Sequence, residues 1–435
     1  MSRPRMSVGN VPSLVLIALL VSAAPARADV WVVDAGGGGD VTNVTSAVTL
    51  ATDGDTILVR PGDYTGGFGS ELLIFGKALS IVSDGTGTVL VNAVRVLGLD
   101  PGELVLLRGL EVVPSPLATT DQGLRVNGGE VWAEDCVFVG EKGIFTIGAH
   151  PASPGVLVDG GAHVVLMRCT AQGGVGVDTF FPYAPTPGAG GEGISVVGAS
   201  VDVYGGEVIG GRGGDFVGFD GGLGPGGNGG HALSGSGAVV FVAGASLQAG
   251  DGGTGDELVQ TPGFYRGGDG IELGGASAVR LLDVDIQPGQ GGLDGNGAPG
   301  PAGVAVDVSS GNVTQHTATY REYALGAPTP EFGTLQLDYT GEPGDVFGVF
   351  FSLDSAHVPL PGRQGSWHLG SPLFGPYNFG PVGPSGTLSL SLPMPGFGIG
   401  PEIALVLREQ VFVLETSGAL LLGSPTVHVI VDGSL

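Results

Sequence analysis

The sequence predicts an all-β protein made of stacked coils of parallel strands, followed by a small antiparallel β-sandwich. Glycine supplies 86 of the 435 residues without the period of collagen, while apolar residues make up 42% of the chain. This combination favours many turns around a true core rather than disorder. Similar segments recur along the middle of the chain, and the composition changes near residue 317.

The first 28 residues have the pattern of a secretory signal peptide. Arg3 and Arg5 precede an apolar run over residues 14–21, and Ala-Arg-Ala follows at residues 26–28. No later apolar run is long enough to cross a membrane as a helix. We therefore expect a secreted protein, retained at the cell surface or free outside the cell, with no transmembrane segment after signal removal.

The chain is strongly acidic. Its net charge of −26 becomes −29 when the three arginines of the signal peptide are removed, because 13 basic residues then face 42 acidic ones. Such a charge repels nucleic acid, and it repels polyanionic sugars unless a cation bridges them. Nucleic acid is therefore excluded as a partner, and nothing in the sequence sets the oligomeric state.

Five similar segments predict the main architecture. They begin at Gly123, Gly155, Gly193, His231 and Gly270, so their starts are 32, 38, 38 and 39 residues apart. Each holds three short runs rich in Val, Ile and Leu with the alternation of half-buried strands. Three such strands cannot bury their own inner face, so the copies are expected to stack into a solenoid, with paired strands about 4.8 Å apart.

The start of the solenoid is marked by "VTSAVTLATDGDTILVRPGDYTGG". Residues 45–51 suit a short helix that caps the open core, and residues 56–59 suit the first inner strand. Together with "KALSIVSDGTGTVLV", this stretch resembles the entry segment of right-handed parallel β-helix proteins of the pectate lyase-like superfamily. The resemblance covers about residues 30–315. It implies the fold but no single activity, because the superfamily holds lyases, hydrolases, esterases and proteins without known activity.

We expect three parts: a signal peptide over residues 1–28, a parallel β-helix over 29–316 and a β-sandwich over 317–435. The last part is suggested by longer alternating segments such as "GTLQLDY", separated by Pro and Gly turns. Cys136 and Cys169 occupy one repeat position in consecutive coils, where stacking places their Cα atoms about 4.8 Å apart, within disulfide range. They are a candidate disulfide, with a stacked pair of reduced thiols as the alternative.

The glycine-rich insertions between the copies carry aromatic residues and are expected to project from one side of the rod. Aromatic faces beside polar groups suit sugar rings, so these residues form a candidate carbohydrate surface; the alternative is that the rings pack down as lids over the coils. The aromatic residues are Phe180, Phe181, Tyr183, Phe216, Phe219, Phe264 and Tyr265, beside Asp178, Asp215, Asp220 and Arg266.

Catalytic signals are weak in comparison. The mature chain has only two lysines, Lys77 and Lys142, and it lacks G-x-S-x-G and H-E-x-x-H motifs. Asp202, Asp283 and Asp285 fall on predicted strands and are expected to face solvent. Glycine runs such as "GGDGIELGG" echo a calcium-binding repeat but lack its spacing. We expect no cofactor, with Ca²⁺ as an alternative, and a carbohydrate-binding protein, with a polysaccharide lyase or glycoside hydrolase and a purely structural surface protein as alternatives.

Overall fold

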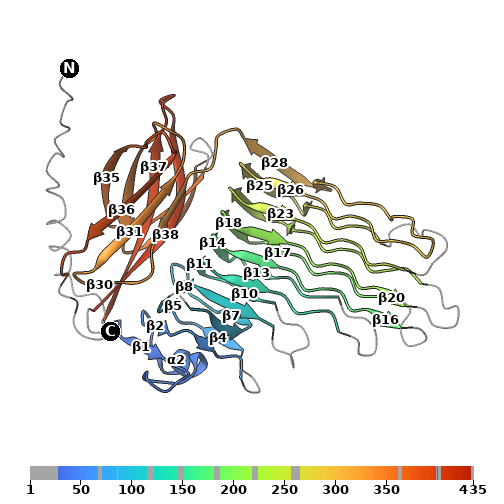
Figure 1. The fold of residues 1–435 in the computed structure, drawn as a ribbon, viewed down its shortest axis with the longest axis horizontal. Helices are drawn as coiled ribbons and strands as arrows, with labels where there is room; N and C mark the ends of the chain where they lie inside the picture. The colour runs from blue at the N-terminus through green and yellow to red at the C-terminus, as the bar shows by residue number, and fades with distance from the viewer. Residues whose placement is uncertain are drawn as a thin grey trace.

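The protein consists of stacked coils of parallel strands with a block of antiparallel strands beside them (Figure 1). The computed structural model describes residues 28–66, 71–85, 87–114, 122–144, 151–180, 187–217, 224–255, 265–360, 365–397, 399 and 403–432. Its strands form three long parallel sheets, and antiparallel sheets follow at the C-terminus. This confirms the predicted fold class.

Each complete coil contributes one strand to each parallel sheet. Sheet A has ten strands: β1 (Val30–Val33), β2 (Thr56–Val59), β5 (Ser80–Ser83), β8 (Leu104–Arg108), β11 (Glu130–Glu134), β14 (His163–Met167), β18 (Ser200–Tyr204), β22 (Val239–Ala243), β25 (Ser277–Leu282) and β28 (Gly311–His316). Sheet B has eight: β4 (Leu72–Phe75), β7 (Val94–Leu97), β10 (Leu124–Asn127), β13 (Val156–Asp159), β17 (Ile194–Val197), β21 (Leu233–Ser236), β24 (Ile271–Gly274) and β27 (Val306–Val308). Sheet C also has eight: β3 (Gly62–Asp63), β6 (Val89–Asn92), β9 (Leu110–Val113), β12 (Val137–Val139), β15 (Thr170–Gln172), β19 (Glu207–Ile209), β23 (Ser246–Gln248) and β26 (Asp285–Gln287).

Alternate residues of these strands form one continuous core of Val, Ile and Leu inside the coils. Its N-terminal end is covered by the helix α2 (Val44–Leu50), which buries Val44, Ala47 and Val48. The side chain of Asn43 caps this helix by accepting a hydrogen bond of 2.7 Å from the backbone N–H of Ser46. The predicted cap helix is therefore present, one residue earlier than expected.

The glycine-rich insertions extend the coils as two layers of paired, nearly straight chain rather than as open loops. One leg leaves sheet C and the other returns to sheet B, and the legs alternate in a ladder of backbone hydrogen bonds. In this ladder Gly191 donates to Gly174, Gly211 to Gly191, Gly230 to Gly211, Gly250 to Gly230, Gly268 to Gly250, Gly289 to Gly268 and Gly303 to Gly289, at 2.8–2.9 Å. Every third residue of the outgoing legs is exposed or half-buried, as at Val175 and Asp178 or at Arg212 and Asp215, a period typical of polyproline II-like chains. We call this two-layered part the glycine slab; the short strands β16 (Thr179–Phe180) and β20 (Phe216–Val217) pair within its outgoing legs.

The C-terminal part is a β-sandwich of two layers, antiparallel except where β30 pairs with β38. One layer has three strands: β29 (Glu322–Leu325), β31 (Thr334–Thr340) and β36 (Thr387–Pro393). The other has five: β30 (Thr329–Pro330), β38 (Leu420–Val431), β37 (Ala404–Leu414), β32 (Val346–Ser352) and β35 (Leu373–Pro381). A hairpin of β33 (Ser355–Leu360) and β34 (Gly365–Leu369) accompanies them. Tyr323, Tyr339, Phe347 and Val411 are among the residues that fill the space between the layers.

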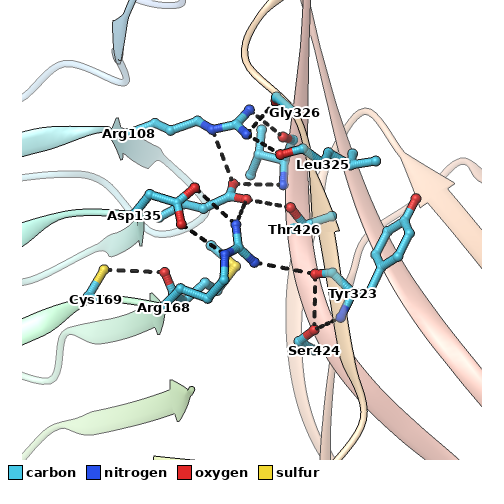
Figure 2. Close-up of polar contacts among 12 residues, drawn as sticks. Arg108, Asp135, Arg168, Cys169, Tyr323, Leu325, Gly326, Ser424 and Thr426 are labelled. Atoms are coloured by element: carbon cyan, nitrogen blue, oxygen red, sulfur yellow. Dashed lines mark hydrogen bonds and ion pairs between the residues drawn. The ribbon is translucent and has the colours of Figure 1, made fainter. Parts of the chain in front are cut away.

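The sandwich packs on the outer side of sheet A, as Figure 1 shows. Trp132 and Phe241 of the sheet belong to the same buried cluster as Val427 and Val429 of β38. A polar network crosses the interface beside this cluster (Figure 2). In it, Arg108 donates to the carbonyl oxygens of Leu325, Gly326 and Val427 at 2.7, 2.6 and 3.1 Å. Sheet A is therefore an internal surface, whereas sheets B and C are not covered by the sandwich.

Cys136 and Cys169 lie buried in consecutive coils, at one position of the repeat, but they are not bonded to each other. The Cys136 thiol donates to the carbonyl oxygen of Glu134 at 3.3 Å, and that of Cys169 to the carbonyl oxygen of Ala133 at 3.3 Å. The structure thus holds the alternative of stacked thiols. Equivalent side chains of stacked coils run parallel and stay about 4.8 Å apart, whereas a disulfide draws the Cβ atoms to about 3.8 Å.

Candidate functional site

Two of the aromatic residues predicted to bind ligand are described with their side chains, and both are buried. Phe216 is 3% exposed and Tyr265 is 1% exposed. Their rings fill space that glycines of the slab leave open: a Cβ atom at Gly224 would lie 2.5 Å from the Phe216 ring, and one at Gly255 would lie 2.2 Å from the Tyr265 ring. These two rings therefore follow the lid alternative and do not form an exposed row.

The side chains of the other predicted aromatic residues lie outside what the structure describes. The backbone of Phe180 lies in β16, next to β20. Phe181, Tyr183, Phe219 and Phe264 lie outside the described residues, as does Asp220.

The charged residues beside these rings join neighbouring coils. Asp178 accepts a hydrogen bond of 2.9 Å from the backbone N–H of Asp215, and Asp215 accepts one of 2.7 Å from that of Thr254. Burial opposes ionisation of Asp215, but Arg212 and Thr254 outweigh it and hold the pKa of this carboxyl below its usual value. Asp178 and Asp215 therefore stabilise the stack of coils through hydrogen bonds to the backbone of the next coil.

A shallow groove of about 230 Å³ lies on the outer face of sheet B. Its lining includes Ser195, Val197, Ser234, Ser236, Glu272, Gly274 and Ser309. Register explains the arrangement: Ser195, Ser234 and Glu272 lie side by side on β17, β21 and β24, and the Ser234 hydroxyl donates to that of Ser195 at 3.1 Å. The missing side chain at Gly274 leaves the depression. We call it the serine groove.

His231, on a returning leg of the slab, contacts Glu272 at the groove. The backbone N–H of Asp269 donates to Nδ1 of His231 at 3.0 Å, so Nε2 is the ring nitrogen that carries the proton. That nitrogen lies 3.2 Å from the carboxylate of Glu272. The groove therefore combines hydroxyls and a carboxylate with Val197, whose side chain is exposed, and an imidazole lies beside the carboxylate. A few polar groups beside apolar surface suit recognition of a polyhydroxylated ligand.

The side chains that could hold a metal ion lie elsewhere. Among the described residues, one such group is found, formed by His163, Asp202 and His368 beneath the sandwich. Asp202 was expected to face solvent, but it is 2% exposed because the sandwich covers its strand; Asp283 and Asp285 are exposed as expected. The prediction for Asp202 was wrong because alternation along one strand places a side chain outside its coil without showing what covers it.

Comparisons with known proteins add no name to this geometry. No protein-family model matches the chain, and no curated protein matches it. In the part of the chain that the structure describes, no helix has the length and hydropathy needed to cross a membrane. The serine groove was not predicted from the sequence, although its signal is visible in Ser195 of "GISVVGAS" and in the alternating serines of "HALSGSG".

Proposed function

We propose that this protein is an exported, extracellular or surface-associated β-helix of the pectate lyase-like type that binds a polysaccharide chain. The serine groove on sheet B is the observation that carries this proposal. It replaces the aromatic insertions as the contact surface, because Phe216 and Tyr265 are buried. The signal peptide pattern and the acidic composition support export.

The groove suits an extended neutral polymer. It crosses several neighbouring strands, about 4.8 Å apart, so a long chain would meet similar groups at regular steps. Serine hydroxyls, the Glu272 carboxylate and the His231 N–H would exchange hydrogen bonds with sugar hydroxyls, and Val197 would meet the apolar side of a ring. The net negative charge disfavours polyanionic chains.

Binding to immobilised neutral and acidic polysaccharides tests the proposal. Gly274→Phe would place a ring in the groove, and a Cβ atom at Gly274 meets only Ser309 Oγ, at an ordinary 3.5 Å. The matched control is Gln248→Phe, at an exposed position of sheet C. We expect Gly274→Phe to weaken binding of a neutral polysaccharide at least about tenfold, with the control unchanged.

The outcomes separate the candidate functions. Equal binding by both variants would place the ligand surface elsewhere, and failure of the unmodified protein to bind any glycan would favour a structural role. The bound polymers are also assayed for new reducing ends and unsaturated products. Either product would instead support the lyase or hydrolase alternative.

A further inference from the structure

Three buried side chains converge where the sandwich covers sheet A. His163 lies on β14 and Asp202 on the adjacent β18, whereas His368 lies on β34 of the sandwich hairpin. One nitrogen or oxygen atom of each lies within 4.8 Å of the corresponding atoms of the other two. The exposed fractions are 9%, 2% and 0%. The β-helix and the hairpin therefore bring metal-ligand atoms together from opposite sides of their interface.

The distances at Asp202 fit a shared ion. Its Oδ2 lies 3.6 Å from Nε2 of His163 and 3.3 Å from Nε2 of His368. A third imidazole, that of His357 on β33, places its Nε2 3.2 Å from the same oxygen. Nitrogen and oxygen ligands about 2.0–2.1 Å from a tetrahedral ion lie about 3.3 Å from each other. Asp202 and the imidazoles of His163 and His368 thus have the separations of a ligand set, whereas the His357 ring is stacked on His163 and lies outside this group.

Several of these atoms are also buried without a hydrogen-bond partner. They include Oδ2 of Asp202, Nε2 of His357 and both ring nitrogens of His163. Buried polar atoms in proteins are almost always satisfied, and those that are not require an explanation such as an ion. Burial without partners is a second observation, independent of the distances, that points to a ligand here.

The local charges favour a cation. The carboxylates of Asp202 and Glu130 both lie beside His163, at 3.6 and 3.4 Å from its ring nitrogens. One divalent ion balances the charge of both carboxylates.

We propose that His163, Asp202 and His368 bind a divalent transition-metal ion, Zn²⁺ by preference, and that this ion fastens the sandwich to the β-helix. Imidazole and carboxylate ligands without thiolate or a ring of carbonyls suit Zn²⁺ and its neighbours in the first transition series rather than Ca²⁺. Three protein ligands and a water molecule would complete a tetrahedral site. Two of the protein ligands come from the β-helix and one comes from the sandwich hairpin.

The surroundings of the ligands support this assignment. Glu130 Oε1 lies 3.4 Å from Nδ1 of His163, the place of the outer carboxylate that commonly orients a metal-bound histidine. Glu130 is itself held by Trp132 and by Ser355 of the hairpin, at 2.7 and 2.9 Å. The Tyr204 hydroxyl lies 2.8 Å from Nε2 of His368. Because a ring nitrogen has one lone pair, Tyr204 would give up this contact when the metal binds.

Titration of the untagged, full-length, chelator-treated protein with Zn²⁺ tests the site. We expect one bound ion per chain, a higher thermal unfolding midpoint, and with Co²⁺ as a probe the visible absorption of a four-coordinate ion. Asp202→Asn and His368→Gln should weaken Zn²⁺ binding at least about a hundredfold, since each removes one of the three protein ligands. His316→Gln, on β28 of the same sheet, is the matched control and should bind as the unmodified protein does.

If the buried variants fail to fold, the stoichiometry and the Co²⁺ spectrum of the unmodified protein still test the proposal. The proposal is overturned if the unmodified protein binds no stoichiometric Zn²⁺ at neutral pH. It is equally overturned if folded Asp202→Asn or folded His368→Gln binds Zn²⁺ as tightly as the unmodified protein.

Discussion

Glycine in the slab is required by close packing and not by backbone conformation. Gly211, Gly250 and Gly289 belong to successive outgoing legs, and a Cβ atom at any of them would lie only 1.8–1.9 Å from a carbonyl oxygen of a neighbouring leg. Their backbones do not have the positive φ of turn glycines such as Gly128 and Gly160. The glycine content predicted many turns, because composition does not distinguish a turn from a close approach of two chains.

Substitution of two adjacent slab residues, Gly289 and Gln290, tests whether close packing requires glycine. Gly289→Ala would force a methyl group to within 1.9 Å of the carbonyl oxygen of Gly250, so we expect a loss of about 3 kcal/mol in the free energy of unfolding from overpacking. Gln290→Ala, at the next and exposed position, should change it by less than about 0.5 kcal/mol. Denaturant unfolding of both variants measures the difference, and similar stabilities would contradict the packing argument.

At the scale of elements, the repeated strands were predictable because alternation of apolar and polar residues is a local signal. The cap helix was predictable for a similar reason, since a solenoid needs cover at its end and residues 44–51 offer one apolar side. The two layers of the slab were not, because their hydrogen bonds join legs that belong to different coils. The serine groove likewise depends on register between coils, which places Ser195 beside Ser234.

The cap of helix α2 can be tested by one substitution. Asn43→Ala removes the side-chain oxygen that accepts the hydrogen bond from the N–H of Ser46. We expect a loss of about 1 kcal/mol in the free energy of unfolding, the usual value of such a cap. Thr45→Ala, at an exposed position of the same helix, is the control and should be neutral or slightly stabilising because alanine favours helix. Protection of the first coil from hydrogen exchange should fall only in Asn43→Ala.

At the scale of the whole molecule, the sandwich buries outward-facing side chains of sheet A that would otherwise be exposed to solvent. Trp132, Asp202 and Tyr204 point away from the coil interior, yet they are buried because the sandwich lies over them. The sequence predicted both parts but not that one covers the other, since the residues that meet lie up to about three hundred positions apart. The histidine cluster was missed for the same reason: its members are dispersed along the chain and meet only at this interface.

The polar network in Figure 2 predicts how this interface responds to acid. Glu134 is fully buried, accepts hydrogen bonds from Thr426 and from the N–H of Val427 at 2.6 and 3.1 Å, and contacts Arg168. Burial opposes its ionisation, but Arg108, Arg168 and Thr426 prevail and lower the pKa of the carboxyl below 4.5. The folded-state pKa is thus below the unfolded one, so the stabilisation is complete above about pH 4.5 and is lost as pH falls toward the folded-state value.

Glu134→Gln should therefore lower stability at neutral pH and make stability depend less on pH in acid. At neutral pH it leaves Arg108 and Arg168 without their buried anion, and we expect a loss of about 3 kcal/mol in stability. Between neutral pH and about pH 3 the variant should lose less further stability than the unmodified protein, because one titrating carboxylate is gone. Thermal unfolding midpoints across this range measure both effects, with Glu207→Gln, exposed on sheet C, as the control. Parallel curves for Glu134→Gln and the unmodified protein would show that this carboxylate does not govern the acid sensitivity of the interface.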